Sequence, residues 1–436
     1  VDALLLVVIT ACYAEPWFVT MRQLQVACVD LCVACRTSTT WHVSVTAETP
    51  RYIWLRQERH RRKSLLRGSR VPLLRVHAIT WDMYFLYISK GSTIMKTMWS
   101  ALILTFGESF NQSIAAVRWP TSLEGLSFGR SFNHSIDLVV WPESMLYLIF
   151  GRDFNQHIDN VQWPPSLRQL TFGSEFNHPI HNVVWPISLQ RHTFGQRFDR
   201  RLSSRVAWPA SLEVLKFGRR FNQPVDTVAW PYSLQTLSFG VDFDHPIAKV
   251  TWPGSLRKLT FGLMFNQPID AVVWPESLCQ LSFGDAFEHP IEHVKWPAAL
   301  KVLSFGLMFN HSIDNVGWPD GLQILTFGTS FNRSIDGVAW PPALKQLTFG
   351  GAFNQPITGA VWPVSLTHLK FRQEPIDGVA WAPSLRTLLL ESSFNRPIDR
   401  VIWPASLRKL TFGRDFNHPI TNVLWPDSLW QLAFGR

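Results

Sequence analysis

Three cysteines near the start of the sequence have the spacing most suggestive of chemistry. Cys28, Cys32 and Cys35 form a CxxxCxxC pattern, a spacing with which cysteines hold three irons of a four-iron cluster. Ala34 precedes the last cysteine where such sites carry an aromatic residue, and no alternation of strands and helices follows to build a barrel around a cluster. We interpret the triplet as chance or structural cysteines and expect no cofactor.

Histidine recurs at one position of a repeated pattern further along the chain. The histidines at this position are His134, His178, His245, His289, His311 and His418. On adjacent strands His289 and His311 would lie about 5 Å apart, a distance at which two histidines could share a metal ion. Other copies of the pattern carry glutamine there: Gln112, Gln223, Gln267 and Gln355. The position is therefore interpreted as a general hydrogen-bonding one, and no metal site is predicted.

Aspartate recurs directly after an isoleucine, at Asp137, Asp159, Asp270, Asp314, Asp336 and Asp399. Isolated aspartates at a repeated position are typical of turns, where the carboxylate accepts backbone N–H groups. No nucleophile, base and orienting group converge anywhere in the sequence. We therefore expect no enzymatic activity and no catalytic residue.

These residues belong to copies of one 22-residue unit, which begins at Phe106 as FGESFNQSIAAVRWPTSLEGLS. The high counts of 21 Trp, 31 Phe and 29 Pro against 6 Tyr fit the copying of such a unit. One step of 23 residues and one of 19 residues interrupt the period, and both changes lie between the Phe and the Trp. That half of the unit tolerates changes in length. The first Phe of the unit recurs at 128, 150, 172, 194, 217, 239, 261, 283, 305, 327, 349 and 371, and then as Leu390, Phe412 and Phe434.

Each unit contains two short stretches with alternating apolar residues. Leu126 and Phe128 form one, and Val117 and Trp119 form the other, so we expect two strands per turn. Two prolines in 22 residues leave no room for a long helix, and the back of each turn is expected to be extended or polyproline-like. A single turn buries too little apolar surface to be stable alone, so the turns must stack.

Two short motifs in the unit resemble known repeats. Leu123, Leu126 and Phe128 form LxxLxF, which resembles the start of the leucine-rich-repeat pattern. The FNxPI motif, as in FNQPI at 265–269, resembles the FNIP repeat family over roughly residues 100–436. The resemblance implies a leucine-rich-repeat-like fold used for protein interaction, in some relatives joined to an F-box or a kinase-like domain. Residues 1–100 show neither an F-box-like segment nor a kinase motif.

We predict an all-β, leucine-rich-repeat-like β-solenoid of about 15 to 16 turns, with a 22-residue period and few helices, over residues 98–436. Residues 1–97 share no period with it. They are interpreted as a small cap, a disordered segment or a poor gene model, and the sequence does not decide among these.

Two polar features of the unit are interpreted as structural. Gly follows the Phe in 14 of 16 turns, which predicts a positive φ or a bulge at the end of the strand. The asparagine after the second Phe is expected to stack into a ladder whose amides bind the backbone of neighbouring turns. Its members are Asn111, Asn133, Asn177, Asn222, Asn266, Asn310, Asn354 and Asn417.

The net charge of +9 is concentrated near the start of the chain. Residues 1–100 hold 13 Lys and Arg against 6 Asp and Glu, which leaves the remaining 336 residues nearly neutral. The run Arg56–Arg70 could be a nuclear-import or nucleic-acid patch, with Ser64 as a kinase site. A solvated or disordered segment is the favoured interpretation, and no nucleic acid partner is predicted. The segment Val1–Ala14 resembles the core of a secretory signal but carries Asp2 and lacks a basic leader. The compartment stays open, with the balance toward the cytoplasm, and no transmembrane segment is expected.

The exposed strand positions vary from turn to turn while the inward ones do not, as expected of a binding surface on a fixed frame. Two turns read FGLMFN and place apolar residues where other turns are charged or small. We therefore predict a protein-protein interaction scaffold, alternatively a structural spacer or a secreted glycan-binding surface protein, with a small-molecule ligand not expected. The partner-binding residues of this hypothesis are Leu263, Met264, Leu307, Met308, Val302 and Ile324.

Overall fold

The computed structural model describes residues 103–372, 376–391 and 393–435, together with three short strands nearer the N-terminus. None of the described residues is helical, so the prediction of few helices is confirmed for them. None of them forms a helix long and apolar enough to cross a membrane. The cysteine triplet, the run Arg56–Arg70 and most of the segment Val1–Ala14 lie outside the described residues.

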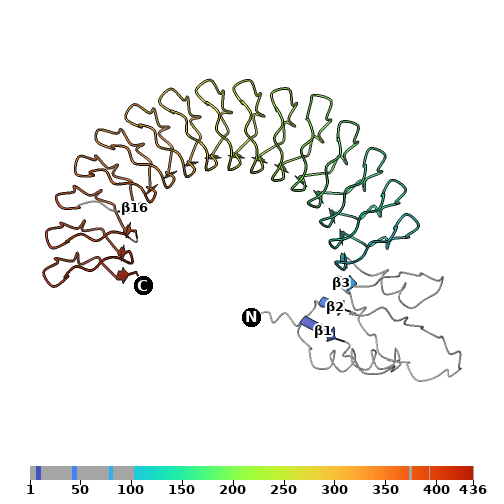
Figure 1. Ribbon diagram of the computed structural model, residues 1–436, viewed down its shortest axis with the longest axis horizontal. Helices are drawn as coiled ribbons and strands as arrows, with labels where there is room; N and C mark the ends of the chain where they lie inside the picture. The colour runs from blue at the N-terminus through green and yellow to red at the C-terminus, as the bar shows by residue number, and fades with distance from the viewer. Residues whose placement is uncertain are drawn as a thin grey trace, which may run out of the picture. The chain divides into compact units, whose positions relative to one another are not determined.

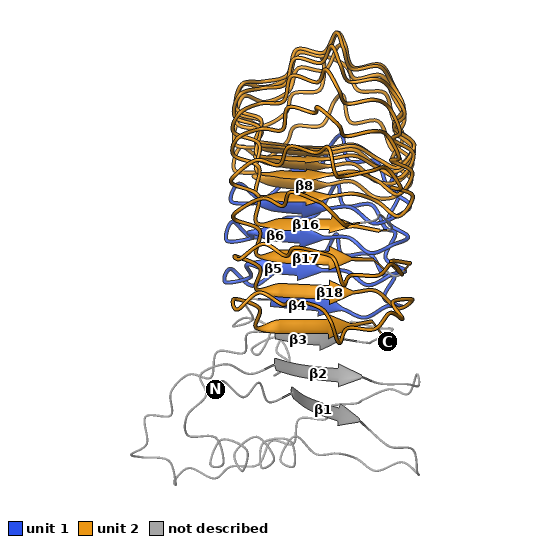
Figure 2. Ribbon diagram, turned by 90° about the vertical axis from the view of Figure 1, so that its left-hand side faces the viewer, with its two compact units in different colours: residues 1–176 blue, residues 177–436 orange. Residues whose placement is uncertain are grey.

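The chain divides into two compact units, residues 1–176 and residues 177–436 (Figure 2). Within each unit, consecutive strands pair in parallel. The first unit holds β1 (Leu6–Thr10), β2 (His42–Thr46), β3 (Ala78–Trp81), β4 (Ile103–Phe106), β5 (Gly125–Ser127), β6 (Tyr147–Ile149) and β7 (Gln169–Thr171).

The second unit holds β8 (Arg191–Thr193), β9 (Val214–Lys216), β10 (Thr236–Ser238), β11 (Lys258–Thr260), β12 (Gln280–Ser282), β13 (Val302–Ser304), β14 (Ile324–Thr326), β15 (Gln346–Thr348), β16 (His368–Phe371), β17 (Thr387–Leu390), β18 (Lys409–Phe412) and β19 (Gln431–Phe434). Within this unit the strands line the inner side of the curve and the loops lie outside (Figure 1).

The register of the strands follows the sequence period. Leu237 pairs with Leu259, 22 residues on, and most pairings repeat this step. At the insertion Arg191 pairs with Val214, and at the deletion His368 pairs with Thr387. The strands stay aligned in both places, so the loops absorb the changes in length. The predicted parallel β-solenoid with a 22-residue period is confirmed, with about 15 turns.

Each 22-residue repeat has one strand followed by three tight turns, so the prediction of two strands per repeat is wrong. The Val and Trp of the expected second strand do point inward, as Val272 and Trp274 show. Proline follows the Trp and has no N–H to donate, which removes one hydrogen bond per repeat and disfavours a ladder along this segment. Between the tight turns run stretches of four or five residues that form neither strand nor turn, such as 265–269 and 272–275. In one 22-residue repeat the hydrogen bonds that close the tight turns run from Phe265 N–H to Gly262 O, from Val272 N–H to Ile269 O and from Leu278 N–H to Pro275 O.

The core consists of side chains that stack on their counterparts in the next turn. The Phe265 ring lies 6.1 Å from Phe243 and 6.3 Å from Phe287, measured between ring centroids. It also lies 4.1 Å from Phe261 of its own turn. All three second-position rings, Phe243, Phe265 and Phe287, are fully buried. Because each ring is covered by the turns on both sides, stacking supplies the burial that a single turn lacks.

The glycine after each strand is required by close approach of neighbouring turns. A Cβ added to Gly262 would lie 1.5 Å from the carbonyl oxygen of Gly240 in the turn before. Among the described glycines only Gly337 and Gly378 have a positive φ, and neither is at this position. The predicted positive φ is therefore wrong, and the physical reason for glycine is lack of space.

Candidate partner-binding surface

The solvent side of the sheet in residues 177–436 is formed by three positions of each 22-residue repeat. In the unit of β11, Arg257 and Lys258 are exposed, Leu259 is buried and Thr260 is half-buried. We call the residue before each strand, together with the first and third strand residues, the sheet face. These side chains repeat from strand to strand because the strands pair in register.

Four of the predicted binding residues lie just beyond the ends of β11 and β13. Leu263 and Met264 are 45% and 54% exposed, and Leu307 and Met308 are 46% and 51% exposed. Their backbone is held by the neighbouring turns: the Met264 N–H donates to Val241 O at 2.9 Å. The side chains therefore project from a fixed backbone. We call these four residues the apolar patch.

The other two predicted binding residues belong to the sheet face. Val302 opens β13 and Ile324 opens β14, where they pair directly in register. Both are half-buried, so they offer less surface than the apolar patch. Val302 and Leu307 lie in the same unit, at the start and just beyond the end of one strand. The six residues thus lie within the four consecutive repeats of β11 to β14, two of them on β13 and β14 and four in the loops that follow β11 and β13.

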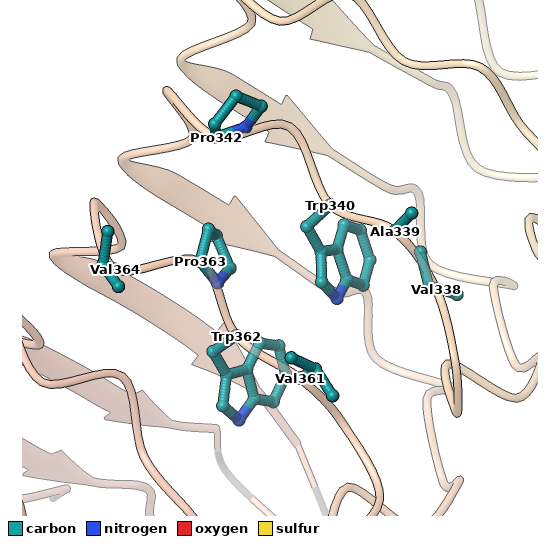
Figure 3. Close-up of a pocket in the computed structure, with 8 residues that line it drawn as sticks. All are labelled: Val338, Ala339, Trp340, Pro342, Val361, Trp362, Pro363 and Val364. Carbon is teal, nitrogen blue, oxygen red and sulfur yellow. The ribbon is translucent and has the colours of Figure 1, made fainter.

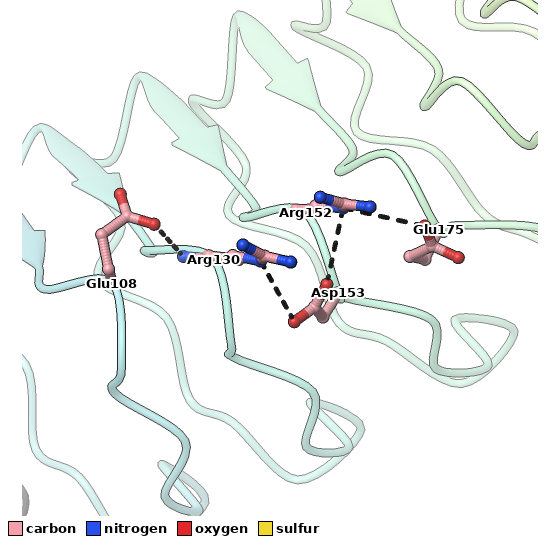
Figure 4. A network of polar contacts seen from close by, with 5 residues as sticks. All are labelled: Glu108, Arg130, Arg152, Asp153 and Glu175. Atoms are coloured by element: carbon pink, nitrogen blue, oxygen red, sulfur yellow. Dashed lines mark hydrogen bonds and ion pairs between the residues drawn. The ribbon is translucent and has the colours of Figure 1, made fainter.

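In residues 106–176 several positions equivalent to the apolar patch carry charged side chains (Figure 4). The Arg130 N–H donates to Glu108 Oε2 at 3.1 Å, and the Arg130 guanidinium lies 4.0 Å from Asp153. Arg152 lies 3.9 Å from both Asp153 and Glu175. Two of these ion pairs, Arg130–Asp153 and Arg152–Glu175, link neighbouring turns, whereas Arg152–Asp153 lies within one turn. The Leu and Met side chains of the apolar patch have no such role.

Six of the eight predicted ladder asparagines accept a backbone N–H group of the following turn, and the other two, Asn354 and Asn417, donate their own N–H to the asparagine of the preceding turn. Asn111 Oδ1 accepts the Asn133 N–H at 3.0 Å, and Asn310 Oδ1 accepts the Asn332 N–H at 2.9 Å. Aspartate does the same where it replaces asparagine, since Asp244 Oδ1 accepts the Asn266 N–H at 2.9 Å. Equivalent bonds come from Asn133, Asn177, Asn222, Asn266, Asn332 and Asn395.

The repeated histidines contact the backbone of the preceding turn. His289 Nε2 lies 3.2 Å from Asn266 O, and His245 Nε2 lies 3.1 Å from Asn222 O. Gln156 at the equivalent position donates from Nε2 to Asn133 O at 3.1 Å. No group of three or more His, Cys, Asp or Glu side chains able to hold a metal ion occurs in the described residues. This geometry serves the cohesion of the turns.

A second apolar surface, which the sequence reasoning missed, lies on the flank formed by the Val-x-Trp segments. Within residues 338–424 its most exposed side chains are Val361 at 73%, Ile402 at 83% and Leu424 at 84%. A shallow hollow of about 300 Å³ lies on it, lined in part by Pro342 and Val364 (Figure 3). Comparing the residue between Val and Trp from unit to unit would have found it. We call Val361, Ile402 and Leu424 the flank strip.

The comparisons with known proteins agree with this architecture. The FNIP Repeat model matches residues 110–153, 132–175, 154–197, 206–242, 221–264, 265–308, 331–373 and 383–436. The crystal structure of CroV588, described as a novel circular LRR protein, is similar at 34% identity with a TM-score of 0.61. The match covers 82% of this chain and 63% of that chain, so this chain spans less than two thirds of its length.

Two further solved structures are similar at low identity. The Toll–Spätzle complex of Drosophila matches at 11% identity with a TM-score of 0.50, over 77% of this chain and 50% of that chain, and shows the fold alone. An internalin, InlF, from Listeria monocytogenes matches at 13% identity with a TM-score of 0.45, over 77% of this chain and 88% of that chain. No curated protein matches the sequence.

Proposed function

Because the chain belongs to the FNIP repeat family and its units stack into a leucine-rich-repeat-like solenoid, we propose that it is a non-enzymatic scaffold that binds a partner protein. Solenoids of this kind offer an extended surface built from the variable positions of a fixed frame. The proposed contact surface is the apolar patch together with Val302 and Ile324.

The exposure of the apolar patch is the observation that carries this proposal. Leu and Met occupy two positions of the repeat that carry charged side chains such as Arg130 and Arg152 elsewhere in the chain, and about half of each apolar residue is exposed to solvent. Exposed apolar groups in one place often mark partner sites, and Met adapts to irregular surfaces. Their replacement should leave the core intact, because these four side chains are about half exposed, whereas the core is formed by fully buried side chains such as Phe265 and Phe309.

The test compares capture of partner proteins by three versions of the full chain. The patch variant carries Leu263→Ser, Met264→Ser, Leu307→Ser and Met308→Ser. The control variant carries Val361→Ser, Ile402→Ser and Leu424→Ser, which removes similar apolar area from the flank strip. Proximity labelling followed by mass spectrometry identifies the captured proteins, and circular dichroism gives the melting temperature of each version.

We expect at least one protein to be captured by the wild type and the control variant and lost by the patch variant, at an unchanged melting temperature. Loss by the control variant alone would move the site to the flank strip and overturn the proposal. Capture that survives both sets of substitutions would also overturn it. A wild type that captures no protein would favour the structural spacer or the glycan-binding alternative.

A further inference from the structure

Positive charge is concentrated on the sheet face of β8 to β18. Residues 177–436 contain 24 Lys and Arg and 19 Asp and Glu. The sheet face of these eleven strands holds ten of the basic residues and one of the acidic ones, Glu213, which leaves 14 basic against 18 acidic residues for everything else in the segment. The basic residues are Arg191, Lys216, Arg257, Lys258, Lys301, Lys345, Lys370, Arg386, Arg408 and Lys409.

These charges are open to solvent and almost all lack an acidic partner. Eight of the ten residues are exposed, and Lys370 and Lys409 are half-buried. Lys370 pairs with Glu391 at 2.6 Å. Within the described part of the chain, none of the other nine has a carboxylate within 4.0 Å. The sheet face therefore presents a positive potential that its own side chains do not neutralise.

The basic residues before the strands are regularly spaced. Arg257, Lys301 and Lys345 precede β11, β13 and β15, so they are separated by two strand spacings, which is about 10 Å. The Arg408 N–H donates to Arg386 O at 2.8 Å, so these two arginines occupy the same position on adjacent turns. Like charges on neighbouring strands are destabilising. Their arrangement in a row therefore does not serve the stability of the fold.

The row of basic residues and the apolar patch lie in the same units. In the unit of β11, Arg257 and Lys258 stand at the start of the strand, and Leu263 and Met264 follow its end. The unit of β13 repeats this arrangement with Lys301 and the pair Leu307 and Met308. One partner lying across these strands would meet positive charge along one side and apolar side chains along the other.

Building on the proposed function, we propose that the partner presents an acidic polypeptide segment to the sheet face, with carboxylates about 10 Å apart along the row Arg257, Lys301, Lys345 and Arg386, and with Arg408 one strand spacing beyond Arg386. Acidic residues three apart in a polyproline II segment, at about 9.3 Å, match this spacing. Acidic residues seven apart on a helix, at about 10.5 Å, also match it. Charge complementarity of this kind steers association and selects among partners.

An acidic protein is favoured over a nucleic acid by the other residues of the sheet face. Surfaces that bind single-stranded nucleic acid combine basic residues with aromatic side chains on which bases stack. The sheet face of β8 to β18 carries no Phe, Tyr or Trp. It carries Val302, Ile324 and Leu389 among the basic residues, which suit the side chains of a polypeptide.

The test measures fluorescence anisotropy of labelled probes with the full chain. The first probe is a 24-residue peptide of Glu-Pro-Ser repeats, which places a carboxylate at every third residue. The second peptide has the same composition with all glutamates at one end, and the third probe is a 24-nucleotide thymidine oligonucleotide. The face variant carries Lys301→Gln, Lys345→Gln, Arg386→Gln and Arg408→Gln. The control variant carries Lys249→Gln, Lys295→Gln, Arg396→Gln and Arg400→Gln, which removes the same charge from exposed positions off the sheet face.

We expect the spaced peptide to bind more tightly than the clustered one, with affinity that falls as salt is raised. The face variant should lose on the order of tenfold in affinity, since it removes four exposed ion pairs that contribute about twofold each, and the control variant should change by less than about twofold. Equal losses in the two variants would overturn the proposal, because net charge alone would then explain binding. Tighter binding of the oligonucleotide, with the same dependence on the face residues, would show a nucleic acid surface instead.

The fate of the proposed function is read separately, from the capture experiment. If the face variant still captures the partner that the patch variant loses, the acidic segment is refuted and the scaffold function stands. If no partner depends on the apolar patch, the scaffold function at that site is refuted whatever the peptides do.

Discussion

The asparagine ladder is interrupted at Glu288, and repairing this position is predicted to stabilise the neighbouring turn. At Glu288 the chain has a side chain one methylene longer than the Asn or Asp found in other turns. The Glu288 N–H still donates to Asn266 Oδ1 at 2.9 Å. In the described part of the chain, the Asn310 N–H of the next turn has no acceptor, whereas the Asn332 N–H one turn later is bound by Asn310 Oδ1. Replacement of Glu288 by Asn should supply the missing acceptor.

The magnitude follows from the bonds seen in the other turns, which are 2.9–3.0 Å long. A hydrogen bond of this kind contributes about 1 kcal/mol net, which corresponds to about fivefold in the local opening equilibrium. Amide hydrogen exchange at Asn310, followed by mass spectrometry or NMR, should therefore slow by about fivefold in Glu288→Asn. The amide of residue 288, whose acceptor Asn266 is unchanged, is the internal reference.

Two further substitutions separate side-chain length from charge. Glu288→Asp keeps the charge and shortens the side chain, and it should protect the Asn310 amide as Asn does, because Asp244 serves as an acceptor in the ladder. Glu288→Gln removes the charge and keeps the length, and it should give no protection. Protection by Gln equal to that by Asn would refute the geometric reasoning and point to charge. No protection by either Asn or Asp would show that the ladder bond adds nothing at this turn.

Two other predictions concern the stacking of the turns. Gly262→Ala should lower the urea midpoint by an amount equivalent to about 1–3 kcal/mol, because its Cβ would meet a backbone oxygen. Gly254→Ala, with open space around the added Cβ, should be neutral or slightly stabilising, and equal effects of the two substitutions would contradict the close-approach explanation. Deletion of one whole repeat, residues 262–283, should keep the β-sheet circular dichroism signal and its cooperative melting, whereas deletion of 11 residues from it should reduce both. Similar damage from the two deletions would argue against independent stacked turns.

The sequence was sufficient to predict the solenoid because the inward residues repeat with a fixed period. Leu259, Phe261, Phe265 and Val272 are all buried, and each belongs to a position that is apolar in nearly every repeat. The local backbone was harder to predict. The alternation at Val272 and Trp274 is that of a strand, but whether a strand forms depends on hydrogen bonds to a neighbouring strand, and the proline after the Trp removes one of them. The reason for Gly262 lies in the distance between two turns, which the sequence of one turn does not contain.

The segregation of charge was missed for a different reason. Summing over the repeats gave a nearly neutral chain, since the acidic residues of the loops, such as Asp270 and Asp314, offset the basic residues of the sheet face. A net charge averages over surfaces that point in different directions, whereas a partner meets one surface at a time. Once the register places Arg257, Lys301 and Lys345 at the same position of alternate units, the sum separates into a basic sheet face and acidic surroundings.

The same separation bears on how a partner would be selected. The apolar patch alone would accept many apolar surfaces, because contacts made by Leu and Met depend little on direction. Basic residues at about 10 Å intervals beside it would reject partners whose adjoining surface is basic and favour those with matching carboxylates. The acidic loops on the remaining surface would repel the same acidic segment elsewhere on the molecule. On this reasoning the apolar patch supplies contact area, and the charge pattern of the sheet face determines which protein uses it.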